Sequence, residues 1–345
     1  MQQRMAPRNI IVIGASWGGL KAFKEILSGL PENLPAAVFI VQHIAPDAPG
    51  LLSGILNRSG ELPAFLPRDH EPIKLGNVYV APPDHHLLLE KGFIRITRGP
   101  KENRARPSVD VLFRSAAYAY GSSVIGVVLT GHLEDGSAGL WAIKDRGGTS
   151  IIQDPAEAEA PSMPDNALRQ VEIDYQVPLR EIAPLLMELS ATSVNEEPRH
   201  PPSEGMRLEV AIASEDRTME TEIKDLFEPS TYACPECHGV LMKIPEGNHT
   251  RYRCHTGHAY SGLSLISHIS ETTEETLWTA IRSIQEGAFL LREFAEERQR
   301  RGNEKEYRML LEKAEEAQRR ADTVRLVAMS HEKVVPPNVE GSKKY

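Results

Sequence analysis

The chain has 345 residues, of which 41% are hydrophobic and 25% are charged, the balance of an ordinary globular protein. This length is enough for two or three units that each bury a core. The formal net charge of -9 argues against a general nucleic-acid binder, because neutralising phosphates requires a surplus of Lys and Arg. It also gives no support to binding at an anionic membrane surface.

The start of the chain, MQQRMAPRN, leads into a strand pattern without the apolar region of a signal peptide. Apolar stretches such as residues 36–41 are too short to cross a bilayer. All three cysteines lie between positions 234 and 254, which is typical of a local metal site in a reducing compartment. We therefore expect a cytoplasmic protein without membrane insertion.

Residues 8–193 alternate short β-branched runs with helical patterns, beginning with the strand pattern NIIVIGAS and a helical stretch over 19–29. This alternation predicts βαβ units and a doubly wound, mostly parallel sheet of the α/β class. In such sheets the ligand lies beyond the carboxyl ends of the strands. Ser16, His43 and Asp135 each follow directly on an apolar run, so we expect them at that end.

The segment GASWGG, residues 14–19, admits more than one interpretation. A dinucleotide fingerprint would need G-x-G-x-x-G and an acidic residue where the chain has His43, and a P-loop would need Gly-Lys-Ser/Thr. The segment fits better the G-x-S-x-G elbow, in which a strand-to-helix turn exposes a serine hydroxyl. Ser16 is then the nucleophile, His43 its base, and Asp135 the carboxylate that orients the base. The remaining interpretation is an ordinary turn serine.

Six blocks occur in the order and spacing of the CheB family: GASWGG, VQHIAP, VYVAPPDHH, RPSVDVLFRSAA, VVLTGHLEDGSAG and SMP at 162–164. Residues 8 to about 190 therefore resemble that family of bacterial chemotaxis proteins. The resemblance implies a Rossmann-like methylesterase domain that removes methyl esters from glutamates on chemoreceptor helices, releases methanol and deamidates certain glutamines. It also implies the triad Ser16, His43 and Asp135, no cofactor for catalysis, and a methylated chemoreceptor helix or similar signalling protein as partner.

Two positions near the expected site depart from the family pattern. Trp17 follows the serine where the family usually has a small residue, and His132 precedes Leu133 where it usually has methionine and glycine. We expect backbone amides at Trp17 and near His132 to bind the oxyanion, each contributing roughly 3 kcal/mol. The alternative is a catalytically weak or inactive scaffold that recognises a methylated signalling partner. A receiver domain has no room before residue 8, so we expect a switch other than its phosphorylation.

The helix expected after RPSVD begins near Ser108 and Asp110. We expect one of these two side chains to accept hydrogen bonds from the free amides at its start. Glu134 precedes Asp135 and is expected to be solvated, because a single carboxylate suffices for a triad.

Three cysteines have the spacing of a zinc ribbon, namely Cys234, Cys237 and Cys254. The stretch RCHTGHAYS resembles the RC-x-x-GH ending of zinc modules that follow CheB-like esterase domains in some bacterial proteins, which implies His258 as fourth ligand. The competing candidates are His255 and His238. Four protein ligands leave no open coordination position, so we expect a structural zinc and no zinc catalysis.

Residues 277–328 carry two matched heptad stripes around a Gly-Asn turn, which predict an antiparallel helical hairpin. We expect this hairpin to bind a coiled-coil partner or to form a homodimer. The predicted organisation is an esterase domain (8–193), a linker (194–206), a zinc-ribbon-like module (207–262) with a short strand at 207–214, a helical hairpin (263–331) and a disordered tail (332–345).

Overall fold

The computed structural model describes residues 5–195, 199–216, 226–246 and 249–330. The chain forms two compact units, the first running to Leu265 and the second beginning at Ile266. Part of the predicted linker (196–198) and the predicted tail (332–345) lie outside the described residues. Within the described ranges, no helix combines the length and the apolar composition needed to cross a membrane.

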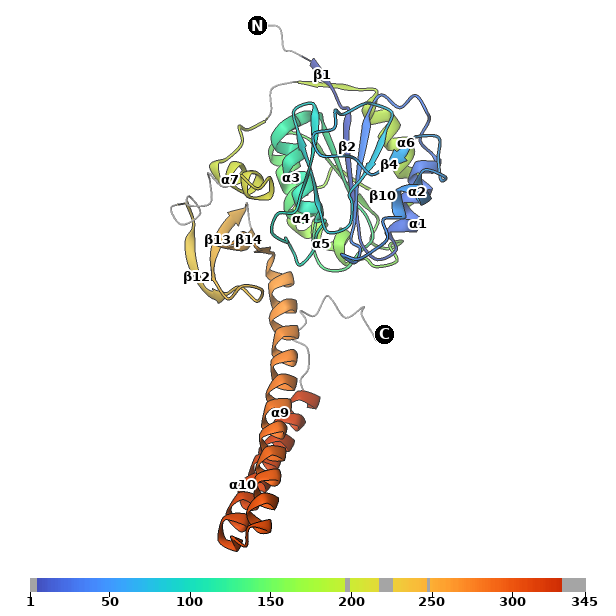
Figure 1. Cartoon of the computed structure of the whole chain (residues 1–345). Coiled ribbons are helices and arrows are strands. Elements are labelled where there is room, and N and C mark those ends of the chain that lie inside the picture. Colours follow the sequence, from blue (N-terminus) through green and yellow to red (C-terminus); the bar gives the residue numbers. More distant parts are fainter. Residues whose placement is uncertain (1–4, 196–198, 217–225, 247–248, 331–345) are drawn as a thin grey trace. The chain divides into compact units, whose positions relative to one another are not determined.

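A sheet of seven parallel strands forms the centre of the first unit, in the order β10-β9-β8-β2-β3-β5-β4 (Figure 1). The strands are β2 Ile10–Ala15, β3 Ala37–Gln42, β4 Ala64–Phe65, β5 Val78–Val80, β8 Val124–Val128, β9 Thr149–Gln153 and β10 Tyr175–Val177. The strands that follow β2 in the chain, β3 to β5, lie on one side of it, and the later strands β8 to β10 lie on the other side. This places a topological switch point beside β2, where α/β sheets bind ligands.

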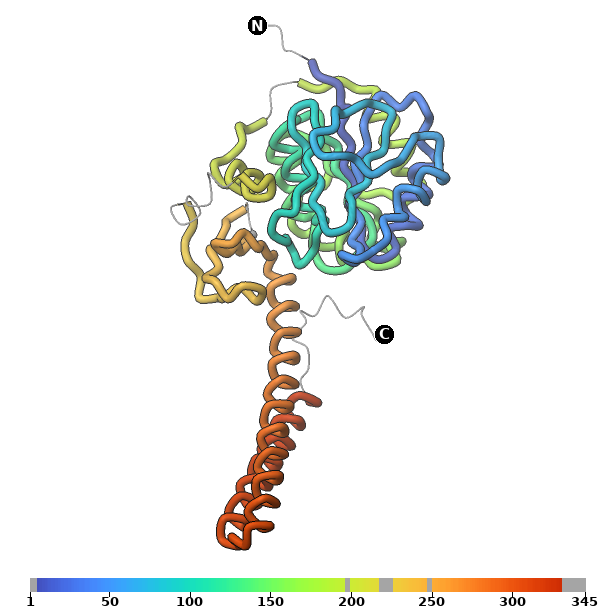
Figure 2. Tube along the Cα trace, viewed as in Figure 1, coloured from blue at the N-terminus to red at the C-terminus, as the bar shows by residue number. Residues whose placement is uncertain are grey.

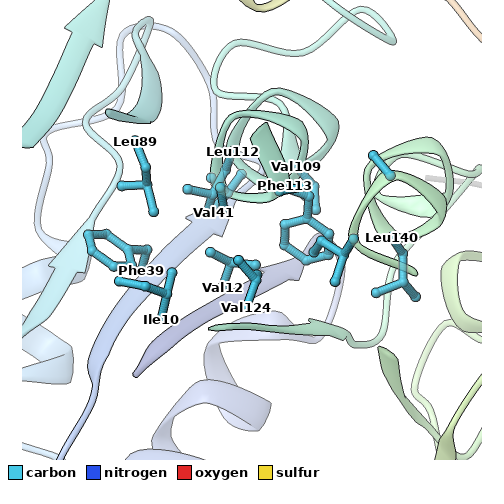
Figure 3. Packing of buried hydrophobic residues seen from close by; sticks show 14 of the residues in the cluster. Ile10, Val12, Phe39, Val41, Leu89, Val109, Leu112, Phe113, Val124 and Leu140 are labelled. Atoms are coloured by element: carbon cyan, nitrogen blue, oxygen red, sulfur yellow. The ribbon is translucent and has the colours of Figure 1, made fainter. Parts of the chain in front are cut away.

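Helices cover both faces of the sheet, which confirms the predicted doubly wound α/β fold (Figure 1). On one face lie α1 Gly19–Ser28, α2 Leu52–Leu56 and α6 Leu179–Ser190. On the other lie α3 Val109–Tyr120, α4 Ser137–Asp145 and α5 Ser162–Gln170. Figure 3 shows Val12 and Val124 of the sheet packed beneath Phe113 and Leu140 of this second layer. The inner strands β2, β3, β8 and β9 are buried on both faces, which explains their largely apolar, β-branched composition.

Smaller elements surround this core. An antiparallel hairpin is formed by β6 His86–Glu90 and β7 Phe93–Thr97, and a two-stranded pair by β1 Met5–Pro7 and β11 Ser193–Asn195. A 3₁₀ turn, η1 Gly121–Ser123, precedes β8.

The strand expected over 207–214 is wrong, because these residues belong largely to helix α7, Glu204–Ala213. The hydroxyl oxygen of Ser203 accepts a hydrogen bond from an amide in the first turn, the usual N-cap arrangement. Leu208 and Ile212 are both buried in one small cluster, and their spacing of four residues is that of a helix face. The N-cap serine and this spacing outweigh the β-branched content of the segment.

Residues 228–260, called the cysteine module below, form a four-stranded antiparallel sheet. Its strands are β12 Glu228–Ala233, β13 Val240–Glu246, β14 His249–Cys254 and β15 Ala259–Tyr260. Two long helices follow, α9 Gly262–Arg300 and α10 Glu304–Ser330. Between them the chain turns back on itself (Figure 2), and Arg298 Nε lies 3.1 Å from Glu306 Oε2. Beyond residue 270, the buried side chains of these helices recur every seven residues within each helix and are Ile281, Ala288, Ala295, Ala314, Ala321 and Ala328.

Buried ion pairs attach the cysteine module to the α/β domain. Arg251 and Arg253 of β14 contact Glu102, which lies in the loop before α3, and Glu209 of α7. Arg114 of α3 lies 3.1 Å from Glu102 and 3.2 Å from Glu209. All five side chains are at most 3% exposed. Burial alone would raise the pKa of Glu102 and of Glu209, but the three guanidinium charges hold both below the ordinary value.

Candidate active site

Ser16 and His43 stand at the carboxyl ends of two paired strands. Ser16 follows β2, His43 follows β3, and the last residues of these strands, Ala15 and Gln42, are register partners. The amide of His43 donates to the carbonyl of Ala15 at 3.1 Å, and the amide of Ser16 donates to that of Thr130 at 3.0 Å. Both side chains line one cavity of about 490 Å³ at this edge of the sheet. The two residues thus lie at adjoining strand ends and line the same cavity.

Asp135 lies in the loop between β8 and α4 and contacts the ring of His43. Its Oδ2 is 2.7 Å from His43 Nε2, while His43 is about one fifth exposed and Asp135 is buried. A carboxylate only accepts, so Nε2 carries the proton in this contact. The neutral imidazole then has its lone pair on Nδ1. The ring is thus held by the nitrogen opposite to that of the chymotrypsin triad, in which the aspartate holds Nδ1.

The carboxylate of Asp135 caps helix α3. The amides of Val109 and Asp110, the first two helical residues, donate to it at 2.7 and 3.2 Å. The hydroxyl of Ser108 and the side-chain amide of Asn103 each donate to Oδ1 at 2.9 Å. Burial alone would raise the pKa of Asp135, but the hydrogen bond and charge of His43, with the donors Asn103 and Val109, lower that pKa to about 2.

Asp110 in turn caps helix α4. Its Oδ1 accepts from the amides of Gly136 at 3.0 Å and Gly139 at 2.6 Å. Burial and the neighbouring Asp135 raise the pKa of Asp110 well above its ordinary value. The expectation that Ser108 or Asp110 would cap α3 is wrong. Ser108 makes no side-chain cap bond and donates to Asp135, whereas the Asp110 carboxylate accepts from amides of α4.

Trp17 and His132 flank the cavity from opposite loops. Their ring centroids are 6.4 Å apart, and the Trp17 side chain is 55% exposed. The amides of Ser16 and Gly131 are engaged by backbone carbonyls, whereas those of Trp17 and His132 have no acceptor in the part of the chain that the structure describes. Gly18 turns the chain into α1 with φ of 79°, a conformation that suits glycine. Two free amides thus border the cavity beside Ser16.

Three polar residues around the site were not predicted. Gln42 Nε2 donates to the carbonyl of Ser16 at 2.5 Å, which holds the turn that carries the nucleophile. Glu134, expected in solvent, is 5% exposed, and its carboxylate accepts from Gln170 Nε2 at 2.6 Å. Asn103 is 6% exposed and lies against Asp135. Of these three residues, only Gln42 could have been found from the sequence, because it ends the strand before His43.

The four predicted metal ligands converge in the cysteine module. The ligand atoms of Cys234, Cys237, Cys254 and His258 all lie within 4.8 Å of one another. His258 Nδ1 is 3.7 and 3.6 Å from the sulfurs of Cys234 and Cys254, and the sulfurs of Cys237 and Cys254 are 3.5 Å apart. A tetrahedral zinc with ordinary bond lengths needs separations of about 3.6 Å for S···N and about 3.8 Å for S···S. The donor set therefore fits zinc in both chemistry and spacing.

His258 Nε2 lies 3.3 Å from Glu236 Oε2, the contact that typically orients a metal-binding imidazole. The competitor His255 lies against Gly239, outside this set.

Comparison with known proteins gives a consistent result. The family model described as CheB methylesterase matches residues 11–186. A curated relative from Leptospira interrogans is 41% identical over 187 residues, 54% of this chain and 97% of that protein. A relative from Anaeromyxobacter dehalogenans, named protein-glutamate methylesterase/protein-glutamine glutaminase 2, is 40% identical over 54% of this chain and 55% of its own length. The crystal structure of the Thermotoga maritima CheB methylesterase catalytic domain matches with a TM-score of 0.51 and 36% identity, over 52% of this chain and 98% of that one.

Proposed function

The chain belongs to the CheB methylesterase family, and we propose that it is a serine hydrolase that removes methyl esters from glutamates of methyl-accepting chemoreceptors. The observation that carries this proposal is the 2.7 Å contact between His43 and Asp135 at the wall of the cavity that Ser16 lines. The same machinery would hydrolyse the side-chain amide of certain glutamines. No cofactor is needed for either reaction.

The first half of the reaction forms an acyl-enzyme. His43 Nδ1 takes the proton of the Ser16 hydroxyl as its oxygen attacks the ester carbonyl. Asp135 holds the ring through Nε2 and stabilises the imidazolium that results. The free amides of Trp17 and His132 would bind the oxyanion. Collapse of the tetrahedral intermediate breaks the bond to methoxide, which leaves as methanol with the proton from His43.

The second half restores the enzyme. A water molecule gives a proton to His43 and attacks the acyl carbonyl, and the new tetrahedral intermediate releases the Ser16 oxygen. Ser16 takes the proton back and the substrate leaves as glutamate. For a glutamine substrate the first leaving group is ammonia instead of methanol.

The rival function is a scaffold that binds a methylated partner without catalysis. The departures at Trp17 and His132 motivate it, whereas the contact of His43 with Asp135 favours the enzyme. A fluorophosphonate probe, which reacts with activated serines, separates the two. The enzyme predicts labelling in the wild type that disappears in Ser16→Ala and persists in Ser53→Ala. An unlabelled wild type would support the scaffold.

We further propose that Cys234, Cys237, Cys254 and His258 bind a structural zinc, which would cross-link the two turns of the cysteine module. Four protein ligands leave no open position, so the metal would take no part in the reaction. Ligation by free thiolates also supports a cytoplasmic location, where thiols stay reduced.

The helices α9 and α10 are proposed to bind a coiled-coil partner or a second copy through residues 277–328. Alanines occupy five of the six buried positions in this range, while Phe289, Leu290 and Phe294 are each more than half exposed. Light scattering of the purified chain tests the second alternative. A dimer that Phe289→Ser together with Phe294→Ser converts to a monomer would support it, and a monomeric wild type would leave only the coiled-coil partner.

A further inference from the structure

The side chain of Asn103 lies between Asp135 and residues 259–264, where the cysteine module continues into α9. Its Nδ2 donates to Asp135 Oδ1 at 2.9 Å and to Asp110 Oδ2 at 2.8 Å. Its Oδ1 accepts from the backbone amide of Ser261 at 2.8 Å and from the hydroxyl of Ser264 at 3.0 Å. The backbone amide of Ser261 can only donate, so the orientation of the Asn103 amide follows from its partners. A flipped amide would turn its oxygen toward two carboxyl groups.

The backbone of the Asn103 loop is attached to the same module. The Asn103 amide donates to the carbonyl of Ala259 at 2.8 Å, and the Ala259 amide donates to the carbonyl of Lys101 at 3.1 Å. The preceding residue, Glu102, is held by the buried arginines of β14, with Arg251 Nη2 at 2.9 Å. The position of Asn103 therefore depends on the cysteine module and not on the α/β domain alone.

A second attachment reaches the other side of Asp135. The amide of Leu263, in the first turn of α9, donates to Glu134 Oε1 at 2.8 Å. Glu134 is the immediate neighbour of Asp135 in the chain and is buried. Residues 259–264 thus hold Asp135 through Asn103 and through Glu134. This segment lies outside residues 11–186, which match the family.

We propose that the cysteine module is a working part of the active site, and that Asn103 is a positioning residue through which residues 259–264 hold Asp135 in the orientation that His43 requires. The module supplies no reacting group. Without the Asn103 amide, Asp135 Oδ1 would lose one of its three donors, and the carboxylate could rotate away from His43. The inference rests on the proposed serine hydrolase, because its readout is the reactivity of Ser16.

The test measures two quantities in the full-length chain, the rate of fluorophosphonate labelling of Ser16 and kcat for methanol release. In Asn103→Ala both should fall about 10- to 100-fold while KM stays within about twofold. Ser264→Ala, which removes only one donor to Asn103, should lower them less. Ser230→Ala is the matched control, since Ser230 lies in the cysteine module and its hydroxyl accepts from the amide of Tyr232, two residues away.

Double variants separate positioning from general destabilisation. If Asn103 acts through Asp135, Asn103→Ala should add no further loss in an Asp135→Asn background. Wild-type labelling and kcat in Asn103→Ala, or a full additional loss in that background, would overturn the inference. If Asn103→Ala does not fold, the same comparison with Ser264→Ala decides. A wild type that is labelled at Ser16 but releases no methanol would contradict the proposed substrate and not the role of Asn103.

Discussion

Asp110 and Asp135 cap each other's helices. Asp135 accepts from the first amides of α3, where Asp110 lies, and Asp110 accepts from Gly136 and Gly139 at the start of α4, directly after Asp135. Their pKa values move apart, that of Asp135 down to about 2 and that of Asp110 well above the ordinary value. Two neighbouring carboxyl groups are thereby shifted in opposite directions, Asp135 toward the charged form beside His43 and Asp110 toward the neutral form within the helix layer.

Replacing Asp135 by Asn should remove most of the activity and part of the stability. An asparagine cannot accept from all five donors, and it would favour the wrong tautomer of His43. We expect kcat to fall by about 10⁴-fold and the free energy of unfolding by about 1–3 kcal/mol. Methanol release and urea unfolding measure the two effects. The control is Asp47→Asn at an exposed position; a change there as large as that at Asp135 would contradict the account.

The loss of folding stability at acid pH should depend on Asp135. Its pKa is about 2 in the folded chain, below the value of about 3.9 in the unfolded chain. The resulting stabilisation, about 2–3 kcal/mol, is present above pH of about 4 and is lost as pH falls toward 2. Urea unfolding at several pH values should show a steeper loss in wild type than in Asp135→Asn over this window. The contribution of Asp110 to stability has the opposite sign. Because its pKa is raised in the folded chain, this contribution lowers stability as pH rises above about 4. Equal slopes below pH of about 4 would show that Asp135 is not held as described.

Truncating one arginine of the buried ion cluster should be strongly destabilising. In Arg253→Met the carboxylates of Glu102 and Glu209 lose a partner while they stay buried. We expect a loss of about 3–5 kcal/mol in the free energy of unfolding. The matched control is Arg308→Met, whose exposed pair with Glu304 should contribute less than about 1 kcal/mol. Similar small losses in both variants would mean that the cluster does not hold the module.

The proposed zinc site makes a prediction that distinguishes two neighbouring histidines. Mass spectrometry of the purified chain should find about one zinc per chain. His258→Ala and Cys254→Ser should lose the metal, while His255→Ala should keep it, because His255 lies outside the converging set. Loss of zinc in His255→Ala with retention in His258→Ala would make His255, and not His258, the fourth ligand.

Substitution of Trp17 distinguishes the role of its side chain from that of its backbone amide. The ring is exposed at the cavity, whereas the amide belongs to the backbone and survives substitution. Trp17→Ala should therefore raise KM for a receptor fragment about tenfold with a smaller change in kcat, and Trp17→Phe should restore most of the affinity. A fall in kcat alone would instead indicate damage to the oxyanion site.

Much of the catalytic site could be predicted because it depends on local patterns. Apolar runs marked the strands, and the polar residue after each run identified Ser16 and His43 at adjoining strand ends. Asn103 could not be found in this way, because its partners Ser261 and Ser264 are about 160 residues away in the chain. The burial of Glu134 could not be predicted for the same reason, because the amide of Leu263 that donates to its carboxylate is distant in the chain. Helix α7 was mistaken for a strand because its β-branched residues obscured a spacing of four.

The most direct test of the central claim is methanol release from a methylated chemoreceptor cytoplasmic fragment. We expect release by the wild type and its loss in Ser16→Ala and His43→Ala, with both variants still folded by circular dichroism. Methanol release that persists in Ser16→Ala, or a folded wild type that binds the fragment and releases none, would contradict the serine hydrolase proposed here.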